Sequence, residues 1–107
     1  MSAPFVQSVR ARREPVRIGG GNGRLLNLRV EIAELWDVVQ VLAPDTAPVL
    51  DVKNAALRAL LPAADAQGYV MKLRGWEVLD EGQPVSDVGA IDGSIFLLTN
   101  RRRRPVR

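Results

Sequence analysis

The sequence contains no cysteine and no histidine, and only five of its residues are aromatic. Disulfides, zinc sites of the usual kind and catalysis by cysteine or histidine are therefore excluded. No apolar run approaches the ~20 residues that a membrane-spanning helix needs. The first residues, MSAPFVQSVRARR, lack the apolar core of a signal peptide. We therefore expect a cytoplasmic protein.

The net charge of the 107-residue chain is only +3, but it is distributed unevenly. Residues 1–24 hold five arginines against Glu14, and residues 100–107 hold five arginines and no acidic residue. Residues 25–99 hold eleven acidic and five basic residues, and thus carry −6. With the glycines of IGGGNG at 18–23, this pattern predicts three parts: a basic flexible N-terminal tail (1–24), one acidic folded domain (25–99) and an arginine-rich C-terminal tail (100–107).

Alternating apolar and polar residues predict several strands in the central part. LLNLRVEI at 25–32 is typical of a half-buried strand, and DVVQVLA at 37–43 is expected to pair with it as a hairpin. Two registers remain open for the second segment, with either Val39 and Val41 or Val38 and Leu42 facing the core. YVMKLRG, WEVL and SIFLLT predict three more strands at 69–75, 76–79 and 94–99.

One strong helical pattern, APDTAPVLDVKNAALRALLP, occupies residues 43–62. Asp45 or Thr46 is expected to cap the helix, and Pro62 to end it. Its apolar residues recur at helical spacing and form one stripe: Val49, Val52, Ala56, Leu57 and Leu60. The prediction is an α+β domain in which a mixed sheet of four to five strands packs on one helix. The sheet face away from the helix stays available for partners.

Groups with catalytic potential are sparse. LDEGQPVSD at 79–87 brings together Asp80, Glu81, Ser86 and Asp87, and two carboxylates of such a group can bind a cation or act as an acid–base pair. The same residue types dominate ordinary turns, and Ser86 has no histidine to activate it. We therefore predict a solvated turn, with no catalytic, metal-binding or cofactor-binding residues, and do not expect an enzyme.

Two tryptophans and the terminal arginines are candidates for contacts with partners. Trp76 at a strand edge and Trp36 in the hairpin turn either anchor a partner or pack over the rim of the sheet. The arginines either bind phosphate in nucleic acid or lipid head groups, or are solvated. No aromatic residue interleaves them, so any nucleic-acid binding rests on charge alone. The predicted anion-binding residues are Arg101, Arg102, Arg103, Arg104 and Arg107.

Element order and two segments of the chain resemble ubiquitin. LDVKNAALRALLP is similar to the ubiquitin helix around Val52-Lys53, and LRGWEVLDEGQPVSDVGAIDGSIFLLTNRRRR is similar to the part from the third strand to the C-terminus. The resemblance covers residues 25–104 and implies a ubiquitin-like β-grasp fold. A conjugated modifier or sulfur carrier ends in Gly-Gly, whereas this sequence has Arg104-Pro105-Val106-Arg107. The resemblance therefore implies a non-conjugating protein.

Among ubiquitin-like proteins, VSDVGAIDGSIFLL at 85–98 is similar to the YukD/EsaB group linked to bacterial type VII secretion. That resemblance implies a non-catalytic adaptor, placed in the cytoplasm or at the inner face of the membrane, whose partner is a secretion ATPase or a membrane subunit. The expected partner-binding residues are Lys72, Arg74, Trp76, Leu97 and Thr99. Two alternatives remain. VMKLR is similar to the small subunit of toluene-type multicomponent monooxygenases, and the arginine tails suit a nucleic-acid-associated or ribosome-associated protein.

Overall fold

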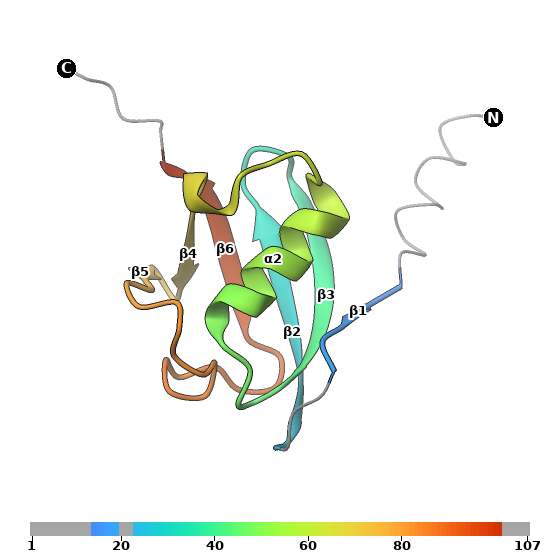
Figure 1. The fold of residues 1–107 in the computed structure, drawn as a ribbon, viewed down its shortest axis with the longest axis vertical. Coiled ribbons are helices and arrows are strands. Elements are labelled where there is room, and N and C mark those ends of the chain that lie inside the picture. The colour runs from blue at the N-terminus through green and yellow to red at the C-terminus, as the bar shows by residue number, and fades with distance from the viewer. Residues whose placement is uncertain (1–13, 20–22, 102–107) are drawn as a thin grey trace.

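The structure is a computed structural model, and it describes residues 14–19 and 23–101. In these residues, one α-helix lies on one face of a six-stranded sheet (Figure 1). The helix is α2 (Val49–Leu60), and a short 3₁₀ helix, η1 (Ala66–Gly68), follows it. The strands are β1 (Val16–Arg17), β2 (Leu25–Ile32), β3 (Asp37–Pro44), β4 (Tyr69–Leu73), β5 (Trp76–Glu77) and β6 (Ile95–Asn100).

The sheet is mixed, with the strand order β1-β3-β2-β6-β4-β5. The β2–β3 hairpin is antiparallel, β6 pairs with β2 in parallel, and β4 pairs with β6 in antiparallel fashion. The first hairpin and the last strand therefore meet at the centre, and α2 provides the crossover that leads toward β4. This arrangement confirms the predicted two-layer α+β class.

The core lies between α2 and the sheet. In β2, alternate residues from Leu26 to Ile32 are buried, as the sequence pattern predicted. In β3 the buried residues include Val39 and Val41, while Val38 is 43% exposed, and this decides between the two open registers. Phe96 and Leu98 of β6 are fully buried and form the inward face of the last strand.

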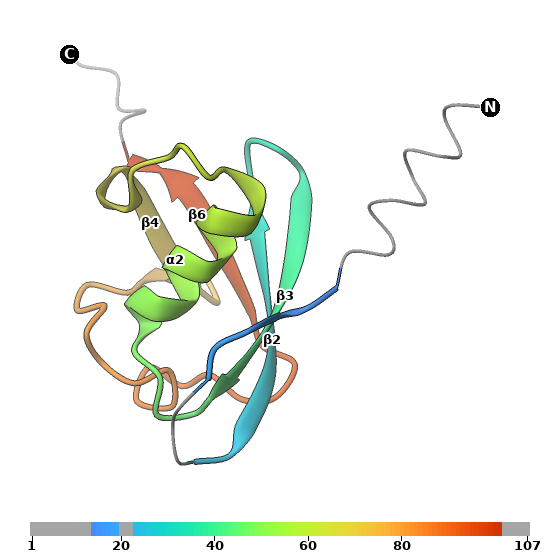
Figure 2. The same ribbon diagram turned by 45° about the vertical axis from the view of Figure 1, so that its right-hand side comes forward.

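The strand count of four to five was too low because part of the N-terminal segment belongs to the sheet. Val16 and Arg17 pair in parallel with Val41 and Leu42, and the Ile18 N–H donates to the Leu42 carbonyl at 2.9 Å. β1 is the edge strand next to β3; Figure 1 shows it beside β3, and in the turned view of Figure 2 the blue segment passes in front of β3. Two residues are too few for a period-2 pattern to be visible in the sequence. At the other end, β6 extends to Asn100, one residue beyond the predicted boundary.

The helix cap differs from the prediction. Pro48 precedes α2 in an extended conformation, and no side chain caps the helix, so the expectation for Asp45 or Thr46 was wrong. The first two helical N–H groups, of Val49 and Leu50, instead donate to backbone carbonyls of Gln83 and Glu81 at 2.9 and 2.8 Å. These carbonyls lie in a distant part of the sequence. They accept hydrogen bonds from N–H groups that have no partner within the helix and that a capping side chain would otherwise satisfy.

Candidate interaction surfaces

The composition of the sheet face opposite α2 follows from strand register. Cross-strand pairing places Val38, Glu31, Leu97, Lys72 and Glu77 in one row across five strands. A second row runs along Gln40, Arg29 and Ile95. The Val70–Thr99 pair lies on the same side of the sheet. We call this surface the open face. It comprises Arg29, Glu31, Val38, Gln40, Val70, Lys72, Glu77, Ile95, Leu97 and Thr99.

Aliphatic and charged side chains are interspersed on the open face. Ile95 is 52% exposed, and Leu97 beside it is half-buried. Leu97 lies between Glu31 on β2 and Lys72 on β4, so an apolar side chain has a carboxylate on one side and an ammonium on the other. Mixed apolar and polar composition of this kind is characteristic of non-obligate protein interfaces.

The five residues expected to bind a partner do not form one surface. Lys72, Leu97 and Thr99 lie together on the open face. Arg74 lies in the β4–β5 turn, and Trp76 lies at the edge of the sheet in β5. Trp76 is 78% exposed, so the alternative in which it packs over the sheet rim was wrong. The same holds for Trp36, which is 85% exposed.

A groove of about 440 Å³ lies beside Trp76. Leu79, which is 85% exposed, and Val88 contribute apolar surface to it, and Arg74 is one of its charged lining residues. The Arg74 guanidinium donates to the Gly89 carbonyl at 3.0 Å, which ties the β4–β5 turn to the loop that leads toward β6.

The β4–β5 turn has the geometry of a tight hairpin. Arg74 and Gly75 both have positive φ values, 54° and 86°. Two consecutive residues with positive φ are typical of the type I′ turn that matches the twist of a hairpin. The sequence Arg-Gly supplies glycine at the second position, where positive φ carries no Cβ penalty, and the turn leads directly into Trp76 at the sheet edge.

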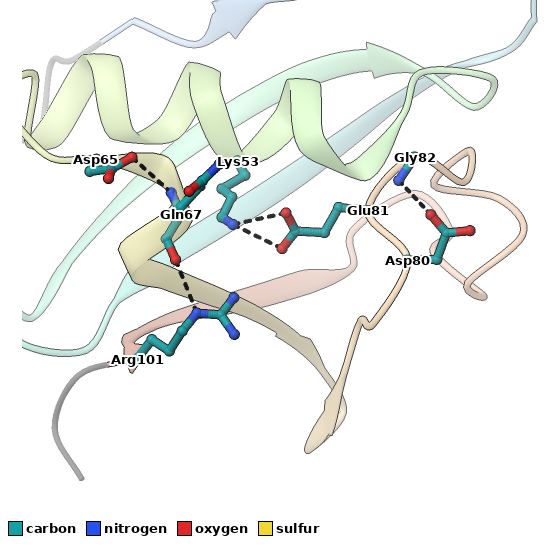
Figure 3. A network of polar contacts seen from close by, with 7 residues as sticks. All are labelled: Lys53, Asp65, Gln67, Asp80, Glu81, Gly82 and Arg101. Atoms are coloured by element: carbon teal, nitrogen blue, oxygen red, sulfur yellow. Dashed lines mark hydrogen bonds and ion pairs between the residues drawn. The ribbon is translucent and has the colours of Figure 1, made fainter.

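An ion pair that the sequence analysis missed connects α2 to the segment after β5 (Figure 3). Lys53 is 2% exposed, and its Nζ lies 2.8 and 2.9 Å from the two carboxylate oxygens of Glu81. Glu81 is therefore a structural partner of a buried ammonium, and its assignment to a solvated turn was wrong. The assignment holds for Asp80, whose exposed side chain accepts the Gly82 N–H at 3.0 Å. The one sequence signal was Lys53 itself, which stands next to the apolar stripe of the helix.

The arginine run begins directly after β6. The Nε of Arg101 donates to the Gln67 carbonyl of η1 at 3.0 Å, and the side chain is otherwise exposed (Figure 3). Arg102, Arg103, Arg104 and Arg107 lie outside the described residues. No described helix is long and apolar enough to cross a membrane. Within residues 14–19 and 23–101, no three acidic side chains gather in a way that would hold a metal ion.

Neither a family model nor a curated protein matches this chain. Solved structures do match. The C-terminal ubiquitin-like domain of mouse tubulin-specific chaperone e is 20% identical, with a TM-score of 0.65 over 83% of this chain and 97% of that domain. Ubiquitin of Caldiarchaeum subterraneum is 14% identical, with a TM-score of 0.64 over 78% and 98%. A ubiquitin-like domain from Arabidopsis thaliana is 12% identical, with a TM-score of 0.64 over 83% and 90%. The fold is therefore the ubiquitin-like β-grasp, as the sequence resemblance implied.

Proposed function

We propose that this chain is a non-catalytic protein-interaction module that binds a protein partner through the open face. The observation that carries the proposal is the exposure of Ile95 at 52% on a sheet where Arg29, Glu31 and Lys72 surround the aliphatic side chains. Aliphatic surface supplies binding energy when it is buried, and the charges around it select the partner and its orientation.

Trp76 and the groove beside it provide a second contact area for the same partner. Exposed tryptophans are enriched among the residues that dominate binding energy at interfaces, because they bury a large area with few rotatable bonds. The bond between Arg74 and the Gly89 carbonyl supports this area, since it holds the turn before Trp76 against the rest of the domain.

The proposal extends to the biological setting. The resemblance of VSDVGAIDGSIFLL to the YukD/EsaB group supports an accessory role in a bacterial type VII-like secretion system. A cytoplasmic ATPase or the membrane subunit of that system is then the partner, and the module acts in the cytoplasm. The resemblance of VMKLR to monooxygenase subunits makes an auxiliary subunit of a diiron hydroxylase the second candidate.

A matched pair of isoleucine substitutions tests the open face. Ile95→Asp places a charge on the open face, whereas Ile91→Asp makes the same change at a residue that is 64% exposed in the loop before β6. Tagged proteins are expressed in the source cells and purified at low and high salt, with and without nuclease. We expect partner proteins to remain with the wild type and with Ile91→Asp, and to be lost with Ile95→Asp.

The identity of the recovered proteins separates the candidates. A secretion ATPase or membrane subunit supports the adaptor, whereas a hydroxylase subunit supports the second candidate. Equal recovery with Ile95→Asp contradicts binding through the open face. A further variant ends after Arg101 and so lacks the last four arginines, but it keeps Asn100, which pairs with Tyr69, and Arg101, which bonds to Gln67. Loss of all partners in this variant, or after nuclease treatment, assigns binding to the arginines.

A further inference from the structure

The strand β1 covers only part of the edge that β3 offers. Its two residues pair with Val41 and Leu42, whereas β3 is eight residues long. Within the described residues, no strand pairs with residues 38–40 on this edge of the sheet. The edge of a sheet presents backbone N–H and C=O groups with which a further strand can pair. The outer edge of β3 therefore accommodates a longer strand than the one that occupies it.

Residues 16–18 lie between β3 and α2, and we call these three residues the strap. Val16 and Ile18 are half-buried against the core, whereas Arg17 between them is exposed. Beside them lies an open pocket of about 230 Å³, to which α2 contributes one wall. Atoms that face such a space lose the dispersion contacts that close packing supplies. The strap therefore occupies its place, which we call the strand groove, without filling it.

Few contacts hold the strap. The Ile18 N–H donates to the Leu42 carbonyl at 2.9 Å, and the residues on either side of the strap, Pro15 and Gly19, are exposed. A Cβ at Gly19 would meet no atom within 4 Å, so the chain has no close neighbours directly after the strap. Segments with few buried apolar contacts open locally more often than the whole domain unfolds. We therefore expect the strap to leave β3 while the rest of the domain stays folded.

We propose that the strap is displaceable and that the strand groove binds an extended segment of a partner protein, with aliphatic residues two positions apart. The walls of this groove are formed by Val41, Leu42, Asn54 and Ala55. The strap itself shows the chemistry that the groove accepts, because its two aliphatic side chains are half-buried and its middle residue faces solvent. A partner strand that also pairs with residues 38–40 gains backbone hydrogen bonds that the strap does not make, and it displaces the strap for that reason.

The strap sets the affinity of this site. A partner competes with a segment of the same chain, so the groove is available only in the fraction of molecules whose strap has left. Weakening the strap raises that fraction and tightens binding, whereas a covalent link that holds the strap prevents binding. The strand groove lies on the α2 side of the sheet, away from the open face, so this site does not depend on the open-face partner.

A peptide of residues 14–19, Glu-Pro-Val-Arg-Ile-Gly, serves as the probe. It is titrated into the isotope-labelled full-length protein, and the amide signals are followed by NMR. The double variant Val16→Ser, Ile18→Ser weakens the strap. It should bind the peptide about tenfold more tightly than the wild type does, because its groove is open in most molecules. The amide signals that shift should belong to β3 and α2.

Two controls match this comparison. Arg17→Ser changes the exposed residue of the strap, and this variant should bind the peptide as the wild type does. A second peptide, with serine in place of its valine and its isoleucine, should not bind. Circular dichroism and urea denaturation show whether each variant is folded before the titration.

The absence of cysteine from the sequence allows a second test within a single protein. Arg17 and Leu42 are register partners on neighbouring strands. Such strands lie about 4.8 Å apart, a separation that a disulfide spans. In the full-length double variant Arg17→Cys, Leu42→Cys, oxidation ties the strap to β3 and reduction releases it. We expect the peptide to bind the reduced protein as it binds the wild type, and not to bind the oxidised protein.

Equal affinity of the peptide for the oxidised and the reduced protein would overturn the proposal, because the peptide would then bind elsewhere. So would the absence of binding to the Val16→Ser, Ile18→Ser variant when that variant is folded. Shifts confined to the open face would contradict the assignment to the strand groove. If the serine variant does not fold, the oxidised and reduced forms of the cysteine variant still decide.

Discussion

Lys53 and Glu81 lie 28 residues apart in the chain, yet the Lys53 ammonium contacts both carboxylate oxygens of Glu81, at 2.8 and 2.9 Å. Lys53 belongs to α2, whereas the backbone carbonyl of Glu81 accepts the Leu50 N–H in the first turn of the same helix. Side chain and backbone of Glu81 thus hold the same helix. The pair therefore fixes the segment after β5 against α2.

Glu81→Gln should lower the free energy of unfolding by about 3 kcal/mol, because it leaves a buried ammonium without its counter-charge. Urea denaturation of the variant and the wild type measures this difference. The double variant Lys53→Met, Glu81→Leu is the control, and it should lose less stability than Glu81→Gln because neither charge remains. Similar losses in both variants would contradict a dominant role for the unpaired charge.

Trp36→Asn should raise the free energy of unfolding by about 0.5 to 1 kcal/mol. Asparagine adopts the left-handed conformation at lower cost than tryptophan, and the exposed indole loses little packing. Thermal or urea unfolding measures the gain. Trp76→Asn, at an exposed strand residue without positive φ, should show no such gain. A protein destabilised by Trp36→Asn would show that the indole packs in solution.

Gly75→Ala should lower the free energy of unfolding by about 1 kcal/mol, because alanine is strained at the φ of 86° that the β4–β5 turn requires. The matched control is Gly68→Ala in η1. Gly68 has no positive φ, and a Cβ there meets no atom within 4 Å. Chemical denaturation should separate the two variants, and equal effects would argue against strain at the turn.

A chain that begins at Gly23 should remain folded but lose about 1 to 2 kcal/mol of stability. The deletion removes β1, in which Val16 is partly buried against the core, and leaves the buried residues of β2, β3 and α2 in place. Far-ultraviolet circular dichroism tests whether the shortened chain is folded, and urea denaturation measures the loss of stability. Loss of cooperative unfolding would show that β1 is needed for folding itself.

Much of this fold was predictable because its main elements bury one face each. Strict alternation in LLNLRVEI and helical spacing in VLDVKNAALRAL are local consequences of packing a sheet face or a helix stripe on a core. The choice between Val39 and Val38 was not predictable, since β3 has apolar residues on both sides. Only its pairing with β2 decides which residues face α2.

The candidate surfaces were less predictable from the sequence than the fold was. Lys72 and Leu97 were named from a resemblance, but strand pairing is what makes them neighbours, and it separates Trp76 from them. The exposure of Trp36 and Trp76 was also undecided in the sequence, because an edge tryptophan packs or projects according to the neighbouring segments.

The sequence by itself determined the element types, the apolar faces, the absence of cysteine and histidine and the arginine run after the last strand. These properties are local, or are matters of composition. Tertiary structure alone decided that Glu81 neutralises Lys53 and that backbone carbonyls of Gln83 and Glu81 cap α2. The physical reason is that each of these contacts joins residues far apart in the chain, and their positions follow from sheet order and register.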